Sequence, residues 1–306
     1  VASGMGTPVL LILACLMTGI ARGGNSNFAN TMISTLPGDK ATRGYNLLHG
    51  CFAVGALLSP LLLIFCAGRW PGLGWRIMAG LLCLLCISQL VVYAKMPLPP
   101  EYAKKSITSV DLRFFKVKQF WLGAAMLFFY ISTEYAIVGW LVTYFQDIGV
   151  LDPNQSQMMN SLLWLVIFLG RMVGAVITGK LSRSKLLLLD GVGLFSFFLV
   201  MFFSRTPAPI ILGLVGVGFF MATIYPTAFA FGSDCIRGND LGCSVMIFTG
   251  SAGGILTPAM VGFVAERAGI RAGMGLIVVF AALLLFSILL SVFSVRTAQA
   301  LPEKGE

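Results

Sequence analysis

Long apolar runs separated by short polar stretches make up most of the chain. The runs are about 20 residues long, which is the length that a helix needs to cross the roughly 30 Å hydrocarbon core of a bilayer. A helix on the surface of a soluble protein would show a polar face recurring about every 3.6 residues, whereas the run 276–293 carries no charge at all. The pattern predicts nine membrane-spanning helices, over residues 8–34, 46–66, 74–95, 119–145, 157–180, 186–204, 208–232, 243–265 and 273–295.

The composition excludes several other classes of protein. Hydrophobic residues make up 58% of the chain and charged residues only 11%, against about 25% charged residues in a soluble domain. The net charge of +9 does not indicate a nucleic-acid partner, because the basic residues lie between the apolar runs.

The residues that hold metals or carry enzymatic chemistry are scarce. There is one histidine, and the pair Cys83 and Cys86 lies inside an apolar run without histidines or a second pair nearby, which favours helix packing over a metal or redox site. The chain also lacks the short motifs of hydrolases, metalloproteases and phosphate-binding loops. We therefore expect no cofactor, no metal and no enzymatic activity.

Residues 96–118 form the one long polar stretch between two spans, with prolines at 97, 99 and 100 and five lysines and arginines. We interpret it as a cytoplasmic linker. The predicted domains are a partial N-terminal half with three helices (1–95), the linker (96–118) and a six-helix C-terminal half (119–306).

Positive charge is distributed unequally between the two sides. Fourteen lysines and arginines lie in one set of alternate connecting segments and five in the other, and the side with more of them is cytoplasmic. The sequence thus predicts a multi-pass protein of the cell membrane with an external N-terminus and a cytoplasmic C-terminus.

An internal repeat connects the two predicted halves. The stretch from Gly55 to Pro60 matches the stretch from Gly253 to Pro258 at an offset of 198 residues. At this offset the partner of Gln119 would lie about 80 residues before Val1, which is room for about three spans. We therefore expect a complete protein of six plus six spans, and we expect that the chain of 306 residues does not transport by itself.

Several motifs make the pattern more specific. They are Asn25, Asn27 and Asn30 at the end of the first span, His49 and Gly50 in the second, Tyr130, Glu134 and Trp140 in the fourth, Gly170 and Arg171 in the fifth, and Tyr225, Pro226 and Thr227 in the seventh. Together they resemble the fucose–galactose–glucose proton symporter branch of the major facilitator superfamily. The resemblance implies an all-α membrane protein, a helical bundle of the major facilitator type with nine of twelve transmembrane helices present.

Two positions depart from the family's pattern. The stretch 179–183 resembles the cytoplasmic loop of the superfamily, but its usual aspartate is absent. Ser26 stands where the fucose-permease pattern has an acidic residue. The second departure weakens a direct transfer of the sugar-site chemistry.

Ionisable residues inside spans are candidate functional residues, because placing a charge there costs about 2.5–3.5 kcal/mol on insertion scales. We expect Glu134 to bind and release the coupled proton, and Arg22 to face it across the two halves as an ion pair. Arg22 binding an anionic solute and a structural ion pair remain alternatives. For Arg171 we expect a structural role, with Asp234 as its partner.

Polar and aromatic residues in the spans could bind the hydroxyl groups and apolar faces of a sugar. The candidates for solute binding are Asn25, Asn27, Asn30, Tyr130, Trp140, Asn160, Trp164 and Tyr225. Each could instead serve helix packing, since amides join neighbouring helices and aromatic rings fill interfaces in membranes.

The function predicted by these features is secondary active transport of a small polar solute, a sugar, by alternating access with proton coupling. The expected partners are the solute, protons and the lipid bilayer, and we expect a monomer. The alternatives are an organic-anion or drug facilitator working by exchange or efflux, a channel, and a membrane receptor that binds a ligand without moving it.

Overall fold

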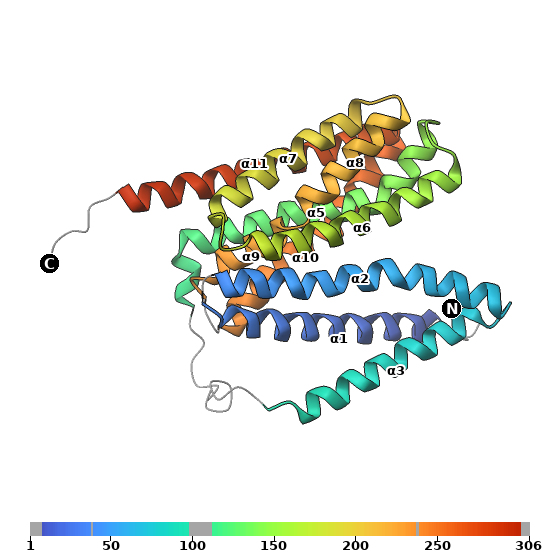
Figure 1. Cartoon of the computed structure of the whole chain (residues 1–306), viewed down its shortest axis with the longest axis horizontal. Helices are drawn as coiled ribbons and strands as arrows, with labels where there is room; N and C mark the ends of the chain where they lie inside the picture. The colour runs from blue at the N-terminus through green and yellow to red at the C-terminus, as the bar shows by residue number, and fades with distance from the viewer. Residues whose placement is uncertain (1–7, 38, 98–111, 237–238, 301–306) are drawn as a thin grey trace. The chain divides into compact units, whose positions relative to one another are not determined.

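The computed structural model describes residues 8–37, 39–97, 112–236 and 239–300, and within them the fold is all-α (Figure 1). A helix covers every predicted span. The elements are α1 (Pro8–Ser34), α2 (Asp39–Arg69), α3 (Gly74–Lys95), the short 3-10 helix η1 (Arg113–Lys116), α5 (Lys118–Asp147), α6 (Pro153–Ile177), α7 (Arg183–Phe203), α8 (Pro207–Met221), α9 (Ile224–Ser233), α10 (Asp240–Ala268) and α11 (Ile270–Ala300).

Among the described residues, eight helical segments are long and apolar enough to cross a membrane. They correspond to eight of the nine predicted spans. The remaining span, 46–66, lies within the 31 residues of α2, where the side chains at 60, 61 and 64 are outside the described set. The expected multi-pass membrane architecture is confirmed.

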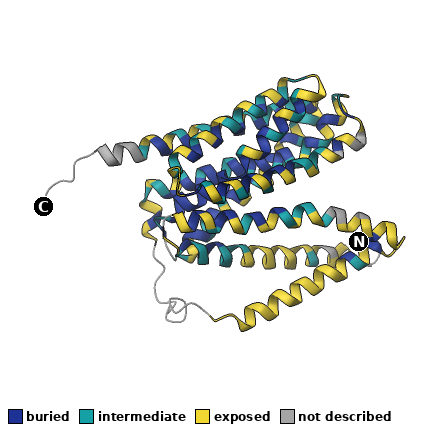
Figure 2. Cartoon of the chain, in the orientation of Figure 1, coloured by how far each residue is buried: buried dark blue, intermediate teal, exposed yellow. Residues whose placement is uncertain are grey.

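The chain forms two compact units. The first joins Val1–Gly50 to Leu112–Glu306, and α5 is central to it because it packs against α6, α9, α10 and α11. Buried side chains concentrate in the helices of this bundle (Figure 2). The predicted division at 96–118 stays a prediction, since residues 98–111 of that linker lie outside the described part of the chain.

The second unit, Cys51–Asp111, contains the C-terminal part of α2 and α3. A tight turn joins the two helices, in which the amide of Gly74 donates to the carbonyl of Trp70 over 2.9 Å. A Cβ atom at Gly74 would lie 2.4 Å from the backbone of Ala67, so only glycine fits at this turn. Most side chains of α3 are exposed (Figure 2), as expected of a helix that meets lipid on several sides.

The seventh predicted span is not continuous, which corrects the single helix expected over 208–232. It is divided into α8 and α9, with Ala222 and Thr223 between them. Pro226 explains the break, because a proline has no backbone N–H and its ring clashes with the carbonyl four residues earlier. That carbonyl belongs to Ala222, which therefore has no helical donor at position 226.

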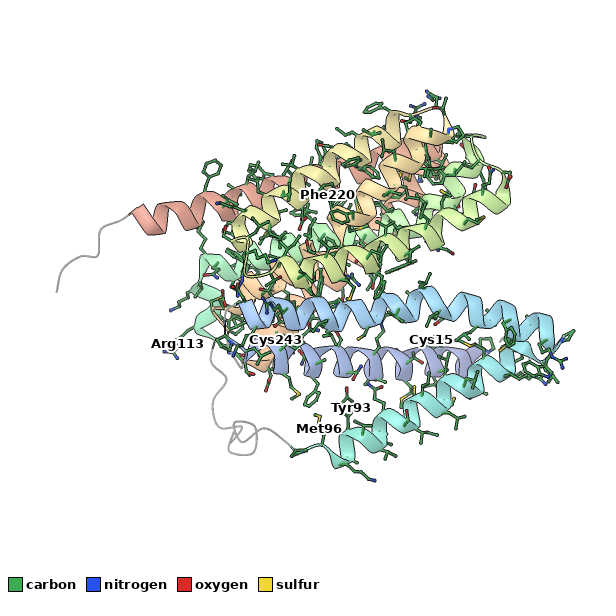
Figure 3. All side chains as sticks on the ribbon, in the orientation of Figure 1. Cys15, Tyr93, Met96, Arg113, Phe220 and Cys243 are labelled. Carbon is green, nitrogen blue, oxygen red and sulfur yellow. The ribbon has the colours of Figure 1, made fainter. Side chains whose placement is uncertain are left out.

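Helices α7 and α8 pack along a regular antiparallel line. A Cβ atom at Gly216 would lie 2.1 Å from the ring of Phe197, and one at Gly193 would lie 2.4 Å from the ring of Phe220. Phe220, which is half-buried, is labelled in Figure 3. The residue numbers in each pair have the same sum, as two antiparallel helices in fixed register require. The glycines let the rings of each helix sit against the backbone of the other.

Candidate functional site

The site is built around the C-terminal part of α6, which approaches the α8–α9 break closely. A Cβ atom at Gly170 would lie 2.6 Å from the Cβ of Ala222, and one at Gly174 would lie 2.1 Å from the methyl group of Thr223. These two glycines are four residues apart and share a face of the helix. Arg171 lies beside them and is only 3% exposed.

The guanidinium group of Arg171 contacts α2, α5 and the break between α8 and α9. Its Nε donates to the carbonyl of Ala222 over 3.3 Å, and its Nη1 donates to the carbonyl of His49 in α2 over 2.5 Å. Its Nη2 lies 3.8 Å from Oε1 of Glu134 in α5. Because Pro226 leaves the Ala222 carbonyl without a helical donor, Arg171 supplies the one that is missing.

The ion pair between Arg171 and Glu134 is buried but loose. The two side chains are 3% and 10% exposed. Their separation of 3.8 Å exceeds the roughly 2.7–2.9 Å of a charge-assisted hydrogen bond. A buried pair needs good geometry to offset the cost of removing two charges from water. At 3.8 Å the two charges attract each other without a direct hydrogen bond between these atoms.

The structure gives these charged residues other partners than the sequence suggested. Arg171 was expected to pair with Asp234, but Asp234 accepts from Arg183 over 2.5 Å. Both of these residues lie at helix ends, where α7 begins and α9 finishes. Arg171 lies more than one turn before the end of α6 and instead reaches sideways to Glu134.

Arg22 was expected to face Glu134, and this pairing is also corrected. Arg22 is exposed on α1, and its Nη2 donates to the hydroxyl of Tyr135 over 3.4 Å. Successive residues of a helix point in directions about 100° apart. Arg22 therefore approaches the neighbour of Glu134 in the chain, on a different face of α5.

Aromatic rings extend the site away from the ion pair. The ring of Tyr225 meets the ring of His49 edge to face at 4.4 Å, and it lies 5.9 Å from the ring of Tyr130. Tyr130 and Glu134 are four residues apart on α5 and share a face. We call His49, Tyr130, Glu134, Arg171 and Tyr225 the buried polar cluster.

The asparagines of α1 are arranged differently from one another. Asn30 is buried and donates from its amide to the backbone oxygen of Ser26 over 2.7 Å. Asn27 is half-buried, and Asn25 is exposed. The side-chain oxygens of Asn27 and Asn30 are buried without a hydrogen-bond partner among the described residues.

The remaining predicted residues are Trp140, Trp164 and Asn160. Trp140 donates from its ring nitrogen to the carbonyl of Pro258 over 3.0 Å and covers Gly262, so it joins α5 to α10. Trp164 is half-buried against the hydrophobic core. Asn160 on α6 is half-buried, and its side-chain oxygen has no partner in the described part of the chain.

One buried acidic residue escaped the sequence reasoning. Asp190 is 4% exposed in α7, and its carboxylate accepts a short hydrogen bond from the hydroxyl of Thr223 at the α8–α9 break. The sequence contained a signal for this residue, because Asp190 stands between four leucines and a glycine inside a predicted span. An ionisable residue in such a position is a functional candidate by default.

Known proteins resemble this chain in both sequence and fold. It is 26% identical over 259 residues to a Helicobacter pylori (strain J99) protein whose name proposes a glucose/galactose transporter, covering 78% of this chain and 61% of the relative. It is 25% identical over 243 residues to a Staphylococcus aureus (strain MSSA476) protein whose name proposes a proline/betaine transporter, covering 73% of this chain and 52% of the relative. The chain thus spans between about half and three-fifths of the length of these relatives.

Among solved structures, the E. coli fucose:proton symporter FucP superposes with a TM-score of 0.69 at 17% identity. The match covers 87% of this chain and 72% of that one, and it concerns the fold. Residues 1–243, which contain the broken seventh span and the buried polar cluster, match the profile of a single family. With helices over all the predicted spans and this match, the chain belongs to the Major Facilitator Superfamily.

Proposed function

We propose that this protein is a secondary active transporter that moves a small polar solute, a sugar, across the cell membrane by alternating access coupled to protons. Family membership supports the transporter class, and the name of the Helicobacter pylori relative supports a sugar. The orientation that accompanies the proposal has a cytoplasmic C-terminus, from the distribution of positive charge.

The observation that carries the proposal is that Arg171 contacts both Glu134 and His49. The same guanidinium group faces the carboxylate of Glu134 and donates to the carbonyl of His49 on α2. Binding of a proton to Glu134 removes the charge that attracts Arg171, so the same guanidinium group can take a new position relative to the carbonyl of His49. Proton binding in α5 is thereby linked to the contact between α6 and α2.

A second contact joins the same two helices near their ends. Nη2 of Arg43 donates to the carbonyl of Thr178 over 3.0 Å. By charge distribution both residues belong to the cytoplasmic side. Opening towards the cytoplasm then requires separation of Arg43 from Thr178 and of Arg171 from His49, so the arrangement described here corresponds to a closed cytoplasmic side.

The solute would be bound by polar atoms that the protein leaves unpaired. Among the described residues, buried polar atoms without a partner include Nε2 of His49 and the side-chain oxygens of Asn27, Asn30 and Asn160. Such groups are costly unless a ligand or water pairs with them. The rings of Tyr130 and Tyr225 would cover the apolar faces of a sugar. Asn25, Trp140 and Trp164 complete the proposed set of binding residues.

The test is uptake by the complete gene product in cells that lack their own sugar permeases. Labelled glucose, galactose, fucose, proline and betaine are offered separately, with and without a protonophore. We expect saturable accumulation of a sugar that the protonophore abolishes. Accumulation of only proline or betaine would refute the sugar, and accumulation that ignores the protonophore would refute proton coupling.

Glu134→Gln is compared with the parent, and Asp234→Asn serves as the matched control because its carboxylate is more exposed and paired with Arg183. We expect Glu134→Gln to lose driven accumulation while keeping exchange of labelled for unlabelled solute, and Asp234→Asn to keep both. If Glu134→Gln accumulates solute as the parent does, the proposed role of Glu134 is wrong.

A further inference from the structure

The contacts on the two sides of the α8–α9 break are made by two different helices. Arg171 of α6 donates to the carbonyl of Ala222, and Asp190 of α7 accepts from the hydroxyl of Thr223. Ala222 and Thr223 are consecutive, so two neighbouring residues of the break are held by ionisable side chains from two different helices, one through its backbone carbonyl and one through its hydroxyl. Arg171 is part of the proposed coupling mechanism, whereas Asp190 has no place in it so far.

The position of Asp190 follows from the packing of α7 on α8. The pairs of Phe197 with Gly216 and of Gly193 with Phe220 lie along one antiparallel line. The next pair in the same register is Asp190 with Thr223. The register of α7 against α8 therefore extends past the end of α8 to the break. At the break the contact is a hydrogen bond between the hydroxyl of Thr223 and the carboxylate of Asp190, whereas the earlier pairs each place an aromatic ring against a glycine.

The side chain of Thr223 is fixed in the rotamer that this hydrogen bond needs. Its methyl group lies against Gly174, where a Cβ atom would be only 2.1 Å away. A β-branched side chain is stiff about its first torsion, so seating the methyl group on α6 directs the hydroxyl to α7. Thr223 is the N-cap residue of α9, yet its hydroxyl makes no capping bond to that helix.

From this arrangement we propose that Asp190 is a positioning residue for the ion pair between Arg171 and Glu134. Asp190 holds Thr223, Thr223 fixes the adjacent carbonyl of Ala222, and that carbonyl orients the guanidinium group beside Glu134. Asp190 thus acts on the coupling pair through the backbone of the break and touches neither member. The inference rests on the proposed coupling role of Glu134 and deepens it.

The test compares two transport modes in the complete gene product. Thr223→Val keeps the shape of the side chain and removes the hydroxyl, and Thr223→Ser keeps the hydroxyl. We expect Thr223→Val to lower proton-driven accumulation by roughly tenfold or more, the scale of one hydrogen bond to a charged group. Exchange of labelled for unlabelled solute should stay within about twofold of the parent, and Thr223→Ser should restore accumulation.

Two further variants separate positioning from folding. Asp190→Ala removes the acceptor of the same hydrogen bond and should reproduce the effect of Thr223→Val. Thr249→Val is the matched control, because the hydroxyl of Thr249 bonds only within its own helix, to the carbonyl of Val245 over 2.8 Å. It should leave both transport modes unchanged.

Comparison of Thr223→Val with Glu134→Gln separates the role of Asp190 from the proposed coupling function. If Thr223→Val loses accumulation and exchange together, the proposed role of Asp190 is wrong. The same holds if Thr223→Val accumulates solute as the parent does while Glu134→Gln is defective, and in both cases the proposed role of Glu134 stands. Normal accumulation in Glu134→Gln would remove the proposed coupling function and this inference with it.

Discussion

Replacing Gly174 by alanine tests the close approach of α6 to the α8–α9 break. The added Cβ atom would lie 2.1 Å from the methyl group of Thr223 and 3.1 Å from the side-chain oxygen of Asn46. Neither neighbour can move easily, because both are buried and Thr223 is held by Asp190. The new atom therefore has to push the break away from α6, and the bond from Arg171 to Ala222 lengthens with it.

The magnitude follows from two opposing terms. Alanine is better than glycine inside a helix by about 1 kcal/mol, and overpacking a filled interior costs about 1–3 kcal/mol. Gly139→Ala is the matched control, since Gly139 lies inside α5 with no atom within 4 Å of the position of a Cβ. The helix term is common to both variants, so their difference isolates the overpacking term of about 1–3 kcal/mol.

The assay is the midpoint of thermal unfolding of each purified variant in the same detergent. About 1 kcal/mol shifts the midpoint of a domain of this size by about 2–4 °C. We therefore expect Gly174→Ala to unfold about 2–12 °C below Gly139→Ala. Equal midpoints, or a higher one for Gly174→Ala, would refute the close contact between α6 and the break.

Three other substitutions give distinct outcomes. Arg171→Lys should lower accumulation by roughly tenfold or more, because one ammonium group cannot reach the acceptors on α2, α5 and the α8–α9 break at the same time. Arg43→Lys loses one bond to a backbone oxygen and should have a smaller effect in the same uptake assay. Pro226→Ala supplies an amide that competes with Arg171 for the carbonyl of Ala222. We expect this variant to be at least as stable as the parent in a thermal assay and to accumulate less solute. Full accumulation would contradict this competition. Asp152→Ala removes the capping box of α6, in which Asp152 accepts from the amide of Gln155 over 2.8 Å, and should cost about 1 kcal/mol of stability with uptake per folded molecule unchanged.

The positions of the helices could be predicted from the sequence because the requirement to cross a bilayer acts on each segment separately. Each predicted span is helical over most of its length, and the first two lie within the 27 residues of α1 and the 31 of α2. The break in the seventh span was also encoded, since Pro226 forbids the helical bond to Ala222. At the repeat offset of 198 the equivalent position is Phe28, and α1 is accordingly unbroken.

The partners of the charged residues could not be predicted in the same way. Whether Arg171 reaches Glu134 or Asp234 depends on the rotation of α6 against α5 and on how closely it approaches α9. That approach is set by Gly170 and Gly174, and no pattern within a single segment states which helix a glycine faces. Asp190 was missed for a related reason, since its partner Thr223 is defined only by the register of α7 against α8.

The carbonyl of Ala222 imposes a condition on every conformation that the protein visits. Since Pro226 has no N–H, the chain can never provide this oxygen with a helical donor. An unsatisfied carbonyl within the bilayer costs several kcal/mol. When Arg171 leaves, a water molecule or a solute hydroxyl has to arrive at the same oxygen. Any movement of Arg171 away from the α8–α9 break is therefore expected to bring a new hydrogen-bond donor to this oxygen.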